Sequence, residues 1–216
     1  MQIRVLGPLE ASVDDRPLAL GGAKQRAVLA MLGLEANRAV AADRLIEGLW
    51  GDAAPPSAAK MVQNYVWRLR KLLDDDGGAV IVTRGRAYEL RIDREQVDAC
   101  RLERLVSEAA HAAGNGENGN AARAALALFR GEPLADVADE PFAATEIRRL
   151  EELRLTAAEL AIDADLAAGR HQEIVGEIDA LLADNPLRDG STPISSTTVW
   201  RAWRYASSAS AWRPQR

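Results

Sequence analysis

Cationic and amide side chains recur along residues 57–73 at spacings that place them on one side of a helix. At about 100° per residue, a line through positions 60, 64, 67 and 71 defines that side. Seven residues lie on or beside it: Lys60, Gln63, Asn64, Trp67, Arg68, Arg70 and Lys71. Ammonium, guanidinium and amide groups can donate to phosphates and base edges. They are candidate nucleic-acid contacts, although such a face taken alone is more often an ordinary solvated surface.

The opposite side of the same segment is apolar. Val62, Val66, Leu69 and Leu73 recur at the spacing of a helix packed on a core. Pro55-Pro56 disfavours helix immediately upstream, and the following serine is a suitable cap. The acidic, glycine-rich run after Leu73 opposes the helix macrodipole and predicts a turn. One helix with a buried side and a cationic side is therefore expected.

Other kinds of chemistry find little support in the sequence. Gly22-Ala-Lys24 lacks the spacing of a phosphate-binding loop, so Lys24 and Arg26 are expected to contact solvent or a DNA backbone. Cys100, His111 and a second histidine at position 171 are too isolated for a metal site. Cys100 is expected to be buried. No nucleophile elbow, zinc-protease or dinucleotide fingerprint is present. We expect no enzymatic activity, no cofactor and no metal.

Charge is distributed unevenly along the 216 residues. The net charge is −5, but residues 1–92 carry +2, residues 93–188 carry −10 and residues 189–216 carry +3. A nucleic-acid-binding surface is therefore expected in the first part, with a domain boundary near Asp93. No apolar run approaches the roughly 18 residues of a membrane span, and the N-terminus does not resemble a secretory signal. A cytoplasmic protein without membrane contact is expected.

The elements around the basic helix predict a winged helix-turn-helix. Residues 2–20 read as short antiparallel strands, and helices are expected over 23–34 and 42–50, joined by a brief extended link at 39–40. After the basic helix, β-rich runs at 80–83 and 88–92 flank Arg84-Gly-Arg86-Ala87. This is a hairpin whose tip carries Arg84 and Arg86, where a wing reaches phosphates or the minor groove.

Four motifs in the first half of the sequence resemble those of a known protein family. The motifs are Lys24-Gln-Arg-Ala-Val-Leu-Ala, Asp43-Arg-Leu-Ile-Glu-Gly-Leu-Trp-Gly51, Val66-Trp-Arg-Leu-Arg-Lys-Leu72 and Tyr88-Glu-Leu. They closely resemble the SARP (Streptomyces antibiotic regulatory protein) transcription activators. The resemblance implies an OmpR/PhoB-type winged helix preceded by an N-terminal sheet. It also implies side-by-side protomers on direct promoter repeats of double-stranded DNA, and recruitment of RNA polymerase through loop 51–56 and the acidic second half.

The second half has helical periodicity over 93–113, 121–129, 143–168 and 171–184. Ala138-Asp-Glu-Pro-Phe142 and two later motifs resemble the bacterial transcriptional activation domain, whose helices stack like tetratricopeptide repeats. The expected fold is thus mostly α with a small β component: a winged-helix domain over 1–92, an incomplete all-α domain over 93–188 and an irregular or disordered tail over 189–216. The tail lacks the family's further helices, and our hypothesis is that a reading-frame change or truncation removed them. The alternative is a basic aromatic arm for single-stranded nucleic acid, because arginines alternate with aromatic rings there.

Two local departures from the family lie in the first domain. Ala87 precedes Tyr88 where relatives usually have glycine, and Trp67 occupies a position usually held by smaller or polar residues. Trp67 could stack on a sugar, contact thymine methyl groups or pack on a neighbouring subunit. The expected function is sequence-specific transcription regulation, in which Lys71 and Lys24 contact the DNA backbone. The alternative is a helical protein-interaction module whose winged helix no longer binds DNA.

Overall fold

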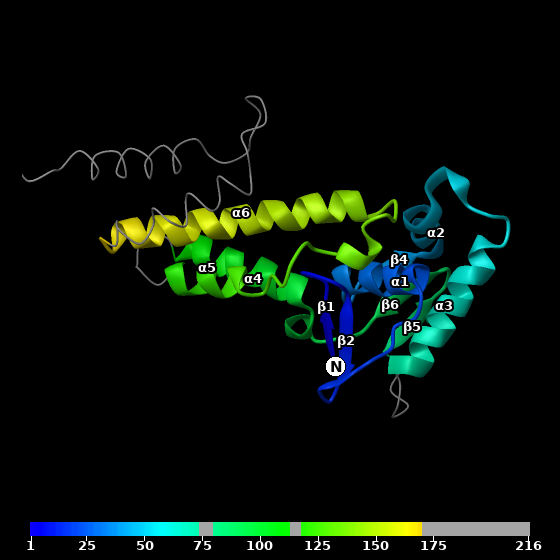
Figure 1. The fold of residues 1–216 in the computed structure, drawn as a ribbon. Coiled ribbons are helices and arrows are strands. Elements are labelled where there is room, and N and C mark those ends of the chain that lie inside the picture. The colour runs from blue at the N-terminus through cyan, green and yellow to red at the C-terminus, as the bar shows by residue number, and fades with distance from the viewer. Residues whose placement is uncertain (74–79, 113–117, 170–216) are drawn as a thin grey trace, which may run out of the picture. The chain divides into compact units, whose positions relative to one another are not determined.

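The computed structural model of the protein describes residues 1–73, 80–112 and 118–169 (Figure 1). These residues divide between two compact units, one formed by the described parts of 1–103 and 127–152 and the other by the described parts of 104–126 and 153–169. Each unit is described by itself. The predicted helix at 171–184, the tail at 189–216 and the acidic turn at 74–76 lie outside the described residues.

The first unit begins with a three-stranded antiparallel sheet, as predicted. Its strands are β1 (Gln2–Arg4), β2 (Glu10–Val13) and β3 (Arg16–Pro17), in the order β1-β2-β3. The β2–β3 turn is Asp14-Asp15, with φ of 49° and 60°. Left-handed geometry at both turn residues matches the twist of the flanking strands. Ile3 and Leu9 are buried and anchor this sheet in the core.

Three helices and a second sheet complete the winged helix. Helices α1 (Ala23–Leu34), α2 (Ala42–Trp50) and α3 (Ala58–Leu73) contact one another pairwise, and a short 3-10 helix, η1 (Gly51–Ala53), follows α2. The second sheet has the order β4 (Ala39–Ala41), β6 (Ala87–Leu90), β5 (Ile81–Arg84). The extended link expected at 39–40 is therefore a strand, because its backbone pairs with β6, far away in sequence.

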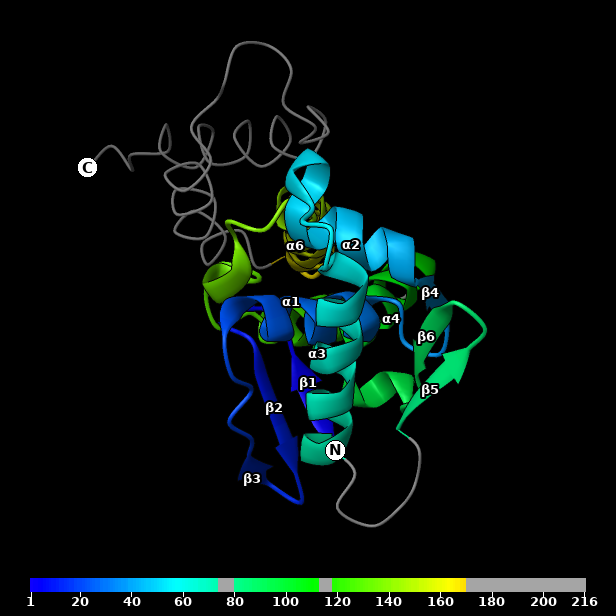
Figure 2. The same ribbon diagram turned by 90° about the vertical axis from the view of Figure 1, so that its right-hand side faces the viewer.

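The bounds of α1 and α2 confirm the prediction, and α3 begins one residue later than its predicted cap. Its whole apolar stripe is buried, including Val62, Val66, Leu69 and Leu73, and Ala58 extends the stripe toward the N-terminus. Figure 2 shows α3 with the β5–β6 hairpin beside it. The rotation of α3 about its axis is therefore set by the core.

Residues 127–152, which the sequence placed in the second domain, pack in the first unit. The amide of Arg130 donates to the carbonyl of Leu6 at 2.8 Å, and that of Leu134 donates to the carbonyl of Val5 at 2.9 Å. The Leu9 amide donates to the Asp136 carboxylate at 2.8 Å. The segment thus satisfies backbone groups of the loop that follows β1.

The remaining elements are helical. The first unit contains the 3-10 helices η2 (Arg94–Gln96) and η3 (Ala135–Val137). The three remaining helices are α4 (Asp98–His111), α5 (Asn118–Leu126) and α6 (Ala143–Ala167). The second unit contains the whole of α5, the part of α4 after residue 103 and the part of α6 after residue 152. Ala109, Ala122 and Ala161 form a small core there. No helix within 1–73, 80–112 and 118–169 combines the length and apolarity that crossing a bilayer requires.

A buried carboxylate joins the start of α4 to the first sheet. Asp98 is 8% exposed and accepts from the Val5 amide at 2.8 Å and the Leu6 amide at 3.0 Å. Burial raises the pKa of Asp98 above its usual value, and these backbone hydrogen bonds act in the opposite direction. The carboxylate is therefore a structural cap for the strand end.

We expect Asp98→Ala to lower the free energy of unfolding by about 1–3 kcal/mol, because it leaves two buried amides without an acceptor. Urea denaturation followed by circular dichroism measures this. Asp139→Ala, at an exposed site, is the matched control and should change stability by less than about 0.5 kcal/mol. Equal stability of the two variants would contradict the role of Asp98.

Candidate nucleic-acid interface

The exposed side of α3 carries most of the predicted contact residues together. Lys60, Gln63, Asn64, Trp67, Arg68 and Lys71 are all exposed. The helix contains four cationic residues and no acidic one. Within the residues that the structure describes, no hydrogen bond or ion pair occupies the side chains of Lys60, Gln63, Asn64 or Arg68. These donors are available to an external ligand, and an anion suits them best.

Trp67 lies in the middle of this face with 55% of its surface exposed. The ammonium of Lys71, one turn later, lies 4.4 Å from the centroid of the indole ring. This distance is within the range of a cation–π interaction. The pair therefore presents an apolar ring and a positive charge side by side.

Arg70 differs from the other predicted contacts. Its Nε donates to the carbonyl of Ile81 at 2.8 Å, and its Nη2 donates to the hydroxyl of Thr83 at 2.7 Å. Both acceptors belong to β5. Two donors of Arg70 are thus occupied by the hairpin, and the side chain holds the wing against α3.

The predicted hairpin forms, but its loop is only Gly85 and Arg86, shorter than the four residues 84–87 that joined the predicted strands. Arg84 pairs with Ala87, and Gly85 in the loop has φ of 61°. The Arg86 side chain is 89% exposed, with its nearest carboxylate, that of Asp43, at 3.6 Å. Arg84 donates to Glu89 at 2.9 Å. The guanidinium groups of Arg84 and Arg91 lower the pKa of Glu89, so the Arg84–Glu89 pair stays charged on the wing.

Lys24 and Arg26, which the sequence predicted to contact solvent or a DNA backbone, both pair with carboxylates of the first unit. The Lys24 ammonium donates to the Leu49 carbonyl and, at 2.6 Å, to Glu140, which is 8% exposed. Arg26 donates to the Leu9 carbonyl at 2.6 Å and pairs with Asp136. Both cations therefore hold segment 127–152 on the helices, and no periodicity in the sequence could reveal partners more than 100 residues away.

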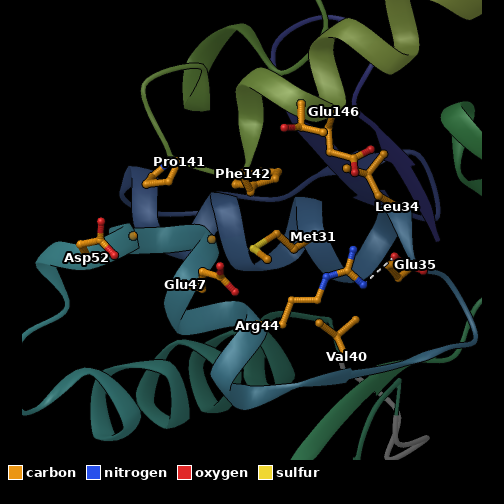
Figure 3. Close-up of a pocket in the computed structure, with 13 residues that line it drawn as sticks. Met31, Leu34, Glu35, Val40, Arg44, Glu47, Asp52, Pro141, Phe142 and Glu146 are labelled. Carbon is orange, nitrogen blue, oxygen red and sulfur yellow. Dashed lines mark ion pairs between the residues drawn. The ribbon is translucent and has the colours of Figure 1, made fainter.

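A concave site that the sequence did not reveal lies beside α2. It has a volume of about 660 Å³. Figure 3 shows the apolar side chains of Met31, Leu34 and Phe142 lining it. A methyl group on Gly48 would lie 2.5 Å from Met31 Cε, so only glycine lets Met31 pack this closely against α2.

The site also has a charged lining. The acidic lining residues are Glu35, Glu47, Asp52 and Glu146, and Arg44 pairs with Glu35 at 2.8 Å. Its acidic lining disfavours phosphate.

The cysteine and histidines, which the sequence indicated are too isolated for a metal site, can be placed only in part. Cys100 is buried, as expected, and burial raises the pKa of its thiol. His111 is exposed at the end of α4. Within 1–73, 80–112 and 118–169, no three His, Cys, Asp or Glu side chains gather as a metal site. The second histidine, at position 171, lies outside these ranges.

Comparison with known proteins matches both halves of the chain. Residues 16–90 match the model "Transcriptional regulatory protein, C terminal", and residues 97–192 match "Bacterial transcriptional activator domain". Regulatory protein DnrI of Streptomyces peucetius is 34% identical over 200 residues, which cover 88% of this chain and 74% of DnrI. The chain belongs to the SARP family of transcriptional regulators.

Longer proteins are also similar to this SARP-family chain. Regulatory protein AfsR of Streptomyces coelicolor is 38% identical over 95% of the chain. The solved structure of Mycobacterium tuberculosis EmbR in complex with a low affinity phosphopeptide aligns with a TM-score of 0.87 and 32% identity, over 97% of the chain and 56% of EmbR. The chain spans only 21% of AfsR, so the activity of that whole protein is not carried over. The mostly helical fold with a winged helix is confirmed.

We expect Lys24→Met to lower the free energy of unfolding by about 1–3 kcal/mol, because it leaves the Glu140 carboxylate and the Leu49 carbonyl without their donor. If Lys24 is internal, the salt dependence of DNA affinity should not change. Lys60→Met is the matched variant: it should leave stability unchanged and reduce the slope of log affinity against log salt by about 1. If Lys24→Met also reduced the slope of log affinity against log salt, Lys24 would contact DNA after all.

Proposed function

We propose that this regulator binds double-stranded DNA sequence-specifically, with α3 in the major groove and the β5–β6 hairpin on the adjacent backbone or minor groove. The observation that carries the proposal is the acid-free exposed face of α3 beside a hairpin tipped by arginine. On that face, no hydrogen bond or ion pair among the described residues occupies Lys60, Gln63, Asn64 or Arg68. The width of the major groove admits an α-helix, and its base edges present the acceptors that these donors need. The protein then works in the cytoplasm, on chromosomal promoters.

The proposed roles follow from side-chain chemistry. Gln63 or Asn64 pairs with adenine, and Arg68 pairs with guanine, since these bidentate pairings fit the base edges. Lys60, Lys71 and Arg86 contact phosphates, and Arg84 does so from the wing while bound to Glu89. Arg70 acts indirectly by positioning the hairpin. Lys24 is not part of the proposed surface.

Assembly and activation are the remaining parts of the proposal. Likeness to the SARP family supports protomers that lie side by side on promoter direct repeats as a dimer on DNA, and contact with RNA polymerase. The acidic concave site beside α2 supports the polymerase contact, because Glu47 and Asp52 line it without an ion-pair partner among the described residues. A basic polymerase surface would complement these carboxylates.

Arg68 and Arg70 provide a paired test of DNA binding. We expect Arg68→Ala to weaken binding to the preferred duplex by about 1–3 kcal/mol at fixed salt, with unchanged stability. Arg70→Ala should instead lower the free energy of unfolding by about 1–2 kcal/mol, because the Ile81 carbonyl and Thr83 hydroxyl lose their donor. Fluorescence anisotropy and urea denaturation measure the two effects.

Wild-type affinity that hardly varies with salt would exclude the release of phosphate counterions and favour a protein-interaction module instead. If Arg68→Ala bound the duplex as tightly as the wild type, the proposal that α3 contacts DNA would be wrong.

Activation should be separable from DNA binding. We expect the double variant Glu47→Gln with Asp52→Asn to bind promoter DNA as the wild type does, because both residues lie outside the α3 face. It should reduce activated transcription several-fold if the carboxylates contact polymerase. Run-off transcription with purified polymerase measures this, with Asp139→Asn as the exposed acidic control. Full activation by the double variant would exclude this surface.

A further inference from the structure

Trp67 is the one large hydrophobic side chain that the described residues expose, with 55% of its surface accessible. It projects from the middle of α3, one turn after Gln63 and Asn64 and one turn before Lys71. Single exposed apolar residues are common on protein surfaces. This one is embedded in the cationic face that we assign to DNA, so its partner is constrained by the charge around it.

The surrounding charge disfavours a second copy of this helix as that partner. Lys60, Arg68 and Lys71 share the exposed face, and α3 contains no acidic residue to offset them. Two such faces brought together would repel each other. A polyanionic duplex is complementary to the same charges.

The position of Lys71 limits how the indole can contact a duplex. Its ammonium lies 4.4 Å from the ring centroid, so it covers part of one ring face. Stacking on a base also requires that base to leave the duplex stack, which costs a few kcal/mol. The uncovered face and the edge of the indole remain for contacts with groups that project from the base pairs.

Thymine offers the apolar group that matches this surface. Its C5-methyl group projects into the major groove, where it lies on the same edge as the adenine atoms that an amide side chain reads. Gln63 and Asn64 precede Trp67 by one turn, so an amide and the indole can reach nearby base pairs. We propose that Trp67 packs on a thymine C5-methyl group and makes this regulator select thymine at that position.

The inference rests on the proposed DNA-binding function and narrows it. It assigns a role to the tryptophan at position 67, where relatives usually have smaller or polar residues. Its apolar contact contributes to base selection in addition to the amide and arginine donors. Burying one methyl group strengthens binding by about fourfold. That is the size of the effect expected for each thymine methyl in contact with the ring.

The test replaces thymine by uracil, which keeps the pairing and the O4 acceptor and removes only the methyl group. A duplex that the wild type selects from a random-sequence pool is synthesised with single thymine-to-uracil replacements. We expect one or two positions at which uracil weakens wild-type binding about fourfold. Trp67→Ala should bind the thymine duplex several-fold more weakly than the wild type and bind the thymine and uracil duplexes equally.

Two controls separate the possible outcomes. Gln63→Ala should weaken binding yet retain the thymine-to-uracil ratio, because the methyl contact is intact. Circular dichroism should show that Trp67→Ala folds, since the buried stripe of α3 is unchanged. A wild type that selects a sequence but binds thymine and uracil duplexes equally overturns this inference alone, as does a Trp67→Ala variant that keeps the ratio. A wild type that selects no sequence overturns the proposed function and this inference with it.

Discussion

The burial of one side of α3 determines which side chains this regulator presents to solvent. Val62, Val66 and Leu69 are each at most 1% exposed, and burial of such a side chain stabilises the fold by about 1.5–3 kcal/mol. Turning the helix by one residue, about 100°, would expose the stripe and bury charged groups. The direction of Lys60, Asn64 and Arg68 is therefore a consequence of packing.

Internal ion pairs decide which of the cations remain free. Lys24 and Arg26 are held by Glu140 and Asp136, which come from the acidic second half of the sequence. Lys60 and Arg68 have no such partner in the described part of the chain. The net charge of −5 thus says little about DNA binding. The acidic half neutralises cations on the scaffold and leaves the α3 face positive.

Local signals in the sequence were reliable where an element is bounded by residues with strong backbone preferences. Gly21-Gly22 precedes α1, and Pro55-Pro56 precedes α3, so both helices begin where predicted to within one residue. The hairpin was equally clear, because two β-rich runs flank a short loop that contains Gly85. The strand β4 was described only as an extended link, since three residues cannot show a period and its pairing partner lies nearly 50 residues away.

The amino-acid sequence by itself determined the helix periods, the two opposed sides of α3, the arginine-tipped hairpin and the family, because these depend on neighbours within a few turns. Only the tertiary structure decided that Lys24 and Arg70 donate to partners within the chain, that segment 127–152 packs in the unit that contains the winged helix, and that an acidic concave site lies beside α2. The physical reason is distance along the chain: a hydrogen bond between residues 24 and 140 exists only once the core has brought them together.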